Sequence, residues 1–411
     1  MTHFADELVQ SDDWSDLSRF KDMPEIDFDR MHRYRIGRIR DELKHNGAAM
    51  CVLVSPISLR YAVDYRSYAL FQSHIPTTYL FVPQEGPVVI HGLYGPPPAM
   101  VDEIRPNRAL SYFDGGPVLG ESASLLADDV VNFLSEIGTD NRRVAVEYVN
   151  PSLTLALNHR GLDVIDGVLI SEQARVIKSI DEVACIQWAV DVAQLGIAKL
   201  KQALKPGVSE LQLWGLLNYT NLANNGDWHD GRMLASGPRI NPWLQEASPR
   251  RVESGDLVGF DTDMIGPFGY FADISRTLHC GPAKPTKRQR DVYQLAAAEI
   301  AHNLDLVRPG VSFAEFQDRA FPVPEEYREN AYTCVVHAVG MCDEYPRINP
   351  GYRGANPYDG VIESGMVLCV ESYMGAQGET GVGVKLEQQV LVTDDGYKLL
   401  STYPLEEALM E

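Results

Sequence analysis

The sequence lacks the cysteine patterns that mark disulfide-rich or zinc-binding domains. It has six cysteines in 411 residues, with no CxxC pair and no zinc-knuckle spacing. This pattern predicts free thiols in a reducing cytosol rather than the disulfides of a secreted protein. Cys342 alone stands inside a candidate active-site segment.

Long apolar runs and positive charge are also scarce. No uninterrupted apolar run approaches the roughly 18 residues of a membrane span. Residues 1–29 are polar and acidic, unlike a signal peptide. The 36 Lys and Arg residues are outnumbered by 57 Asp and Glu residues, which gives a formal charge of −21. We therefore expect a cytoplasmic protein with no nucleic-acid partner and no membrane partner.

The length and the 45% hydrophobic content are sufficient for two domains. We expect the first, residues 1–177, to be an α/β domain in which helices alternate with strands across Gly/Pro turns. It contains no cluster of ligand-type residues. Its expected helices are Phe28–His45 and Ser122–Ile137, and its expected strands are Ala48–Ser55, Tyr79–Val82, Pro87–Ile90 and Arg143–Val146.

The second expected domain, residues 178–411, begins with a long helix. Ser179 is a suitable N-cap residue for that helix, with Asp181 and Glu182 in its first turn. Two further helices are expected at Ser209–Asn225 and Lys287–Leu306. The remainder is rich in strands and carries the chemistry.

Three carboxylates occur in an unusually apolar part of this domain. Residues 257–265 and 270–277 indicate two buried strands, with Gly266–Gly269 as the turn. Side chains alternate along a strand, so Asp261 and Asp263 are expected on one face, which Asp273 reaches from the second strand. Such carboxylates repel one another and lose hydration, and a bound cation is the usual remedy. The alternative is a solvated acidic hairpin, which the apolar neighbours disfavour.

Three more residues extend this set. Glu371 follows an apolar strand, Glu387 lies inside another, and His337 lies in a third apolar segment. A lone histidine is more often structural, but a buried glutamate needs a partner. Five carboxylates and one imidazole are too many carboxylates for a closed structural zinc site. They favour two adjacent ions such as iron, manganese, cobalt or zinc.

The order of these residues resembles the pita-bread metalloenzymes, namely methionine aminopeptidases, prolidases, aminopeptidase P and the metal-free creatinases. The resemblance covers about residues 179–411, and the preceding domain resembles that of the prolidase and creatinase branch. It implies an α+β fold, with a pita-bread domain over 178–411 after a smaller creatinase-type α/β domain over 1–177, and a homodimer. It also implies a dinuclear ligand set: Asp261, Asp273, His337, Glu371 and Glu387. Asp263 is an extra carboxylate that ordinary peptidases of this fold lack.

The sequence departs from the peptidase pattern at two histidines. Residues 239–246 contain no histidine ahead of Asp261, and Asp343 stands where a histidine follows the ligand histidine. In the peptidases, both of these histidines take part in peptide hydrolysis. The departures themselves, in segments 234–246, 260–263 and 342–346, resemble the DddP-type dimethylsulfoniopropionate (DMSP) lyases. This resemblance implies a metal-dependent lyase, with iron as the expected metal, that cleaves a small zwitterion to dimethyl sulfide and acrylate.

The resemblance also assigns roles around the metal site. Asp343 is expected to be the general base and Tyr332 to offer its ring to the sulfonium. Phe71, where the lyases carry a Trp, is a second candidate for the sulfonium, and Trp228 and Trp243 are candidate pocket residues. His74 and His229 are weaker candidates. The simpler alternatives are a turn-capping role for Asp343 and strand packing for Tyr332. For each of the two histidines, a position on the surface or behind the residues that contact the substrate is the simpler alternative.

Two other functions compete with the lyase. A dinuclear metallohydrolase, such as an Xaa-Pro peptidase or a hydrolase of a small amide or imide, would use the same ligands to activate water. A non-catalytic binding protein would have no need for an intact ligand set.

Overall fold

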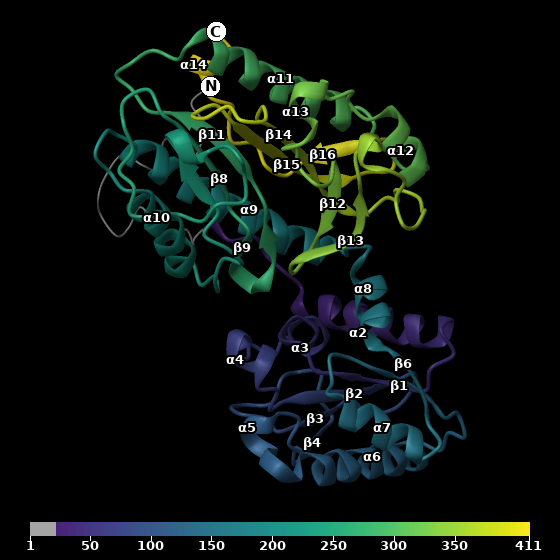
Figure 1. The fold of residues 1–411 in the computed structure, drawn as a ribbon. Coiled ribbons are helices and arrows are strands. Elements are labelled where there is room, and N and C mark those ends of the chain that lie inside the picture. Colours follow the sequence, from purple (N-terminus) through teal and green to yellow (C-terminus); the bar gives the residue numbers. More distant parts are fainter. Residues whose placement is uncertain (1–21) are drawn as a thin grey trace. The chain divides into compact units, whose positions relative to one another are not determined.

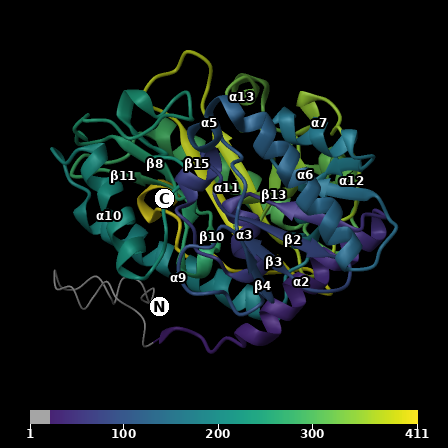
Figure 2. The same cartoon turned by 90° about the horizontal axis from the view of Figure 1, so that it is seen from below.

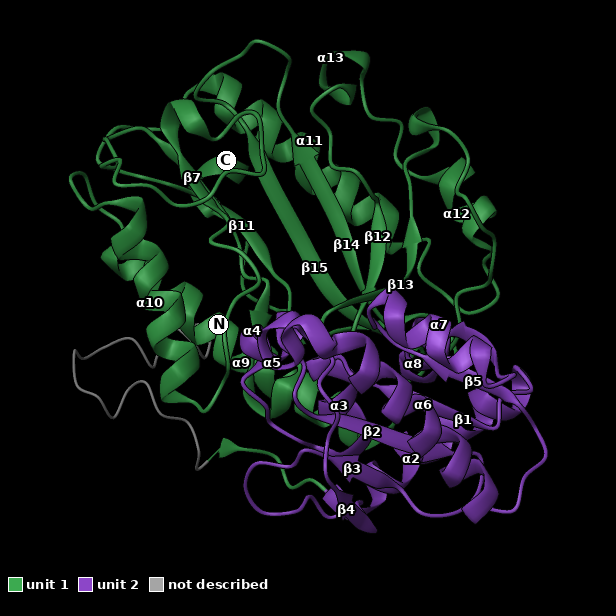
Figure 3. Cartoon of the chain, turned by 60° about the horizontal axis from the view of Figure 1, so that its bottom comes forward, with its two compact units in different colours: residues 1–26, 176–411 green, residues 27–175 purple. Residues whose placement is uncertain are grey.

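The computed structural model describes residues 22–411, which fall into two units that meet in the sequence at Arg175 and Val176 (Figure 3). We call Asp27–Arg175 the N-terminal unit. The C-terminal unit comprises residues 176–411 with the described residues before Asp27.

The N-terminal unit is built on a mixed six-stranded sheet in the order β4-β3-β2-β1-β5-β6. Strand β1 pairs antiparallel with β2 and parallel with β5. Every residue of β1 is buried, as expected for a strand covered on both faces, and helices lie on both sides of this sheet in Figure 1. The strands are β1 (Met50–Leu53), β2 (Tyr79–Pro83), β3 (Val89–His91), β4 (Glu103–Arg105), β5 (Arg143–Val146) and β6 (Asp163–Asp166), and the helices are α2 (Phe28–His45), α3 (Pro56–Val63), α4 (Ala69–His74), α5 (Tyr112–Gly115), α6 (Leu119–Glu136), α7 (Pro151–His159) and α8 (Gly167–Arg175).

The C-terminal unit contains a five-stranded sheet, a three-stranded sheet and a two-stranded ribbon, all antiparallel. Their orders are β13-β12-β14-β15-β16, β11-β8-β7 and β10-β9. The strands are β7 (Leu234–Ser236), β8 (Leu257–Asp261), β9 (Met264–Ile265), β10 (Phe271–Ala272), β11 (Ser275–His279), β12 (Val336–Val339), β13 (Asp343–Ile348), β14 (Val367–Met374), β15 (Val384–Val392) and β16 (Tyr397–Leu399), and the helices are α9 (Ile180–Ala203), α10 (Glu210–Ala223), α11 (Lys287–Leu304), α12 (Phe313–Arg319), α13 (Glu325–Arg328) and α14 (Glu407–Met410).

The long strands β14 and β15 form the centre of this unit. Helix α11 packs on both strands, and Figures 1 and 2 show it beside β15 in two views. Apolar residues of α11, β14 and β15 share one core cluster, which includes Tyr293, Leu368 and Leu386. This packing fixes one face of the sheet and leaves the other for the polar side chains described below.

Helix α9 begins as the sequence predicts. Ser179 Oγ accepts a hydrogen bond from Glu182 N, and the Glu182 carboxylate accepts one from Ser179 N, which completes a capping box. Helix α9 is long and apolar enough, by length and composition alone, to cross a membrane. However, 78% of its apolar window is buried inside the protein, as in a core helix.

The first carboxylate segment also differs from expectation. Strand β8 ends at Asp261, so Asp261 and Asp263 do not alternate along one strand. The chain turns between β8 and β9, and Asp263 adopts a φ of 35°. Aspartate tolerates the left-handed region better than most residues, which explains how it occupies this turn.

Candidate metal centre

Neighbouring strands bring the predicted ligands together. Glu371 on β14 and Glu387 on β15 are directly paired across the five-stranded sheet. His337 on β12 pairs with Cys369 on β14. Asp261 ends β8, and Asp273 lies between β10 and β11, so residues from two sheets converge.

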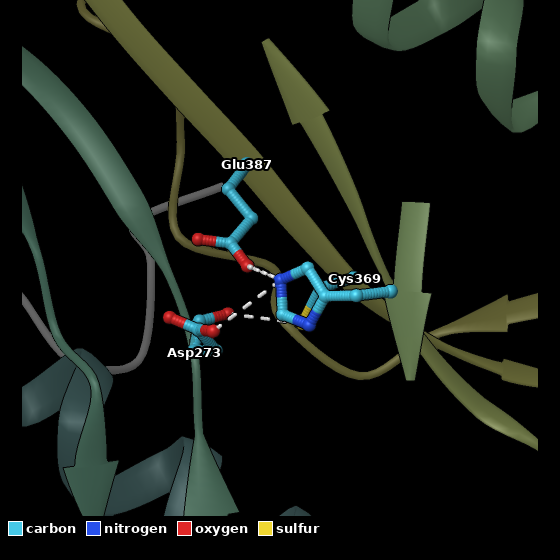
Figure 4. A group of neighbouring side chains, drawn as sticks. Asp273, Cys369 and Glu387 are labelled. Carbon is cyan, nitrogen blue, oxygen red and sulfur yellow. Dashed lines mark hydrogen bonds and ion pairs between the residues drawn. The ribbon is translucent and has the colours of Figure 1, made fainter. Parts of the chain in front are cut away.

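All six predicted ligands occur in three overlapping groups whose candidate ligand atoms lie within 4.8 Å of one another. Cys369 joins one group and was not predicted. Figure 4 shows Asp273, Cys369 and Glu387 facing a common centre. The groups are Asp273, His337, Cys369 and Glu387; Asp261, Glu371 and Glu387; and Asp261, Asp263 and Asp273.

Three buried oxygens in this cluster accept no hydrogen bond from the described part of the chain. They are Asp261 Oδ1, Asp273 Oδ1 and Glu387 Oε1. A buried carboxylate oxygen without a donor is costly, and a cation supplies the missing partner. Oxygen and imidazole ligands suit the borderline and hard ions named above. The residues present therefore fit a pair of metal ions.

A lysine that the sequence analysis did not single out lies inside the cluster. Lys385 is fully buried, and its Nζ lies 2.5 Å from Glu371 Oε2, 2.9 Å from Asp261 Oδ2 and 2.6 Å from Ser275 Oγ. Ser275 Oγ in turn donates to Glu387 Oε2 at 2.8 Å. Lys385 thus contacts one oxygen each of Asp261 and Glu371. The second oxygen of Asp261, Oδ1, remains for a metal, whereas Glu371 Oε1 faces His337 Nε2 at 3.2 Å.

Lys385 and Cys369 could have been found from strand alternation. Each lies two residues before a predicted ligand on a buried strand, Cys369 before Glu371 and Lys385 before Glu387, and so shares the ligand's face. Five carboxylates and one ammonium leave four formal negative charges, which two divalent ions would balance.

Burial and mutual repulsion shift the proton affinities of the cluster. Burial and the neighbouring carboxylates raise the pKa of Asp273 and that of Glu387 well above the ordinary range. For Asp261, burial acts in the same direction, but Lys385 overrides it and the pKa falls to about 2. Burial opposes protonation of His337, yet the hydrogen bond with Glu371 raises its pKa. At Asp273 and Glu387 protons therefore compete with metal ions for the carboxylates.

Asp343 lies at the edge of the cluster. Its Oδ1 is 3.3 Å from His337 Nδ1, on the ring edge away from Nε2, which faces Glu371 at 3.2 Å. The Asp343 side chain is 68% exposed. Local desolvation raises its pKa; His337 opposes the rise, while Asp261 adds to it. A carboxylate with a raised pKa, open to solvent beside a metal cluster, can exchange protons with a bound molecule.

Tyr332 also borders the cluster. Lys385 Nζ lies 4.5 Å from the centre of its ring, which is a cation–π contact. Burial and Glu371 raise the pKa of the Tyr332 phenol, so its ring remains neutral.

The two tryptophans differ in setting. Trp228 is 38% exposed, and its Nε1 donates to Asp230 Oδ1 at 3.1 Å. Trp243 is buried with its ring 5.8 Å from that of Tyr373, so packing accounts for its position.

The remaining aromatic candidates belong to none of the three ligand groups. Phe71 and His74 lie on α4 of the N-terminal unit, and Phe71 is 41% exposed with its ring edge-on to Phe113. His229 Nδ1 is 2.5 Å from the Thr262 carbonyl oxygen. Burial lowers the pKa of His229 to about 4, so the ring is neutral, and it contacts the turn between β8 and β9.

Comparison with known proteins agrees with this geometry. Residues 184–394 match the description Metallopeptidase family M24. The dimethylsulfoniopropionate lyase DddP of Roseovarius nubinhibens is 33% identical over 93% of this chain and 88% of its own length. The protein of the same name from Roseobacter denitrificans is 32% identical over 95% of this chain and 89% of its own length.

The solved structures confirm the predicted fold. An Xaa-Pro dipeptidase from Bacillus anthracis superimposes with a TM-score of 0.71, covering 91% of this chain and 99% of that one, at 20% identity. A dipeptidase PepE from Mycobacterium ulcerans gives a TM-score of 0.70, covering 93% of this chain and 98% of that one. Together these likenesses bear out the predicted α+β pita-bread architecture. The chain therefore belongs to metallopeptidase family M24 and, within it, groups with the proteins named dimethylsulfoniopropionate lyase DddP.

Proposed function

We propose that this protein cleaves DMSP to dimethyl sulfide and acrylate by a metal-dependent β-elimination. The observation that carries the proposal is the carboxylate of Asp343, 3.3 Å from His337 at the edge of a cluster suited to two metals. The likeness to two proteins named as DMSP lyases supports the same substrate.

The reaction needs a general base and groups that stabilise the negative charge that develops beside the substrate carboxylate. The base removes a proton from the carbon beside the substrate carboxylate, that electron pair forms the C=C bond, and the C–S bond breaks with its pair leaving on sulfur. The proton is weakly acidic because the developing negative charge adds to that of the carboxylate. Bound metal ions would hold that carboxylate and withdraw charge from it.

Asp343 is the proposed general base. Its raised pKa brings its proton affinity closer to neutral pH, which is the direction that favours a general base. His337 keeps the carboxylate at the cluster edge. After proton transfer, the exposed side chain can release the proton to water.

The ring of Tyr332 is the proposed neutral wall for the sulfonium. Lys385 already occupies one face of this ring at 4.5 Å, which limits a substrate cation to the other face or the edge. Phe71 and Trp228 are proposed as further aromatic contacts, and Trp243 as support through packing. We further propose that the two ions are iron and that the enzyme acts as a cytoplasmic homodimer. The six cysteines, all within the described residues, form no disulfide, which suits a reducing compartment.

Headspace gas chromatography of the purified, iron-loaded protein with DMSP tests the proposal. We expect release of dimethyl sulfide that stops when the metals are removed by chelation. Absence of dimethyl sulfide from protein shown by elemental analysis to hold two metals would overturn the lyase. The same cluster would then be assigned to activating water for hydrolysis of a small amide or imide.

Asp343→Asn tests the base. This change removes the proton acceptor but keeps the shape of the side chain, so kcat should fall by about 10²–10⁴-fold with metal content unchanged. Asp318→Asn, an exposed change on α12, is the matched control and should leave turnover unaltered. Near-normal turnover of Asp343→Asn would contradict the assignment.

A further inference from the structure

A buried ion pair involves Glu344, the residue that directly follows the proposed base Asp343 on β13. Lys178 Nζ is 2.9 Å from Glu344 Oε2, and the two side chains are only 2% and 1% exposed. Lys178 stands two residues ahead of α9, and Glu344 is the second residue of β13. The pair joins positions that are 166 residues apart in the sequence.

Glu344 also fixes the turn between β12 and β13. Its Oε1 accepts a hydrogen bond from Met341 N at 3.0 Å. Gly340 N donates to Cys342 O at 3.1 Å within the same turn, and Gly340 O accepts from Phe271 N at 2.7 Å. A Cβ atom at Gly340 would lie 2.4 Å from Glu344 Oε2, so the carboxylate packs closely against the turn backbone.

Strand alternation connects this anchor to Asp343. Consecutive residues of a strand point to opposite faces, and β13 alternates between exposed and buried from its first residue. Glu344 points inward to Lys178, so Asp343 must point the other way, toward His337. Because the Asp343 side chain is 68% exposed, packing contributes little to its orientation.

We propose that the Lys178–Glu344 ion pair is a positioning device for the general base Asp343. This inference rests on the proposed function, since it assigns the pair a role through Asp343. Buried ion pairs are expensive and are often replaceable by apolar residues, so stability alone does not account for this pair. A misplacement of about 1 Å at a reacting group can cost about 10²-fold in rate.

The kinetic test uses variants that break the pair. Glu344→Gln and Lys178→Met should lower kcat for dimethyl sulfide release by about 10–100-fold, while KM and metal content stay within about twofold of wild type. Lys178→Arg, which keeps the charge, should retain most of the wild-type kcat that Lys178→Met loses. Lys287→Met, which breaks an exposed ion pair with Asp291 on α11, is the matched control and should leave kcat unchanged.

A double variant keeps the test valid if single variants do not fold. Lys178→Met combined with Glu344→Met leaves no unpaired buried charge. Its kcat should also fall with metals retained. The inference is overturned if folded, metal-loaded variants turn over like wild type, or if kcat falls only in proportion to lost metal. If Asp343→Asn itself keeps its activity, the base assignment fails instead, which distinguishes the two outcomes.

Discussion

At the scale of single residues, charged residues within apolar strands are the sequence signal that predicted most of the candidate metal ligands. Asp261, Glu371 and Glu387 stand out because a charged residue in a buried strand needs a partner. Alternation along β15 places Lys385 on the same face as Glu387, a signal that the choice of carboxylates and histidine as ligands passed over. Only the fold shows that it meets carboxylates from β8 and β14.

Lys385→Met should destabilise the metal-free protein. Removing the ammonium leaves Asp261, Glu371 and Glu387 buried without their cation, and breaking a buried pair typically costs about 3–5 kcal/mol. Urea unfolding of the chelated protein measures this cost. Lys385→Arg, which keeps the charge, should lose much less. An unchanged unfolding midpoint for Lys385→Met would show that the lysine does not neutralise the cluster.

At the scale of elements, alternation and capping predicted several helices and strands well. Helix α2 has the predicted bounds, and the Ser179 cap of α9 forms the expected box. The break after Asp261 could not be predicted, because an Asp in a left-handed conformation leaves no pattern in the apolar residues around it. The three carboxylates still converge, although Asp263 lies on a turn instead of the strand that carries Asp261.

Gly340→Ala should disrupt the turn that precedes Asp343. The new methyl group would lie 2.4 Å from Glu344 Oε2, so the turn or the Lys178–Glu344 pair must shift. We expect a loss of about 1–3 kcal/mol in the free energy of unfolding and a lower kcat.

Gly215→Ala is the control for this change. Gly215 lies in α10, where a new Cβ would meet nothing within 4 Å beyond the helix's own backbone and the adjoining residues. Alanine there should therefore stabilise the helix by about 0.5–1 kcal/mol. Equal effects of the two changes, measured by urea unfolding, would contradict the role given to the turn.

At the scale of the whole molecule, long motifs along the chain identified the family before any geometry was known. What they could not supply is the electrostatic state of the cluster, which depends on burial. Asp273 and Glu387 are buried among other carboxylates, and their raised pKa values follow from that environment alone.

Metal affinity should therefore increase with pH. Burial raises the pKa of Asp273 and that of Glu387, so at lower pH the metal-free site holds protons that a metal must displace. The Kd for Mn²⁺, measured by calorimetry on chelated protein, should fall by about 10-fold per pH unit for each proton displaced. Glu387→Gln should flatten this dependence. A Kd independent of pH in the wild type would show that the cluster is already ionised.

The most direct measurement for the central claim is proton NMR of DMSP incubated with the iron-loaded protein. Elimination predicts acrylate and dimethyl sulfide in equal amounts, with loss of both signals in Asp343→Asn. Formation of 3-hydroxypropionate, or no change in DMSP while two metals are bound, would contradict the account and assign the cluster to hydrolysis.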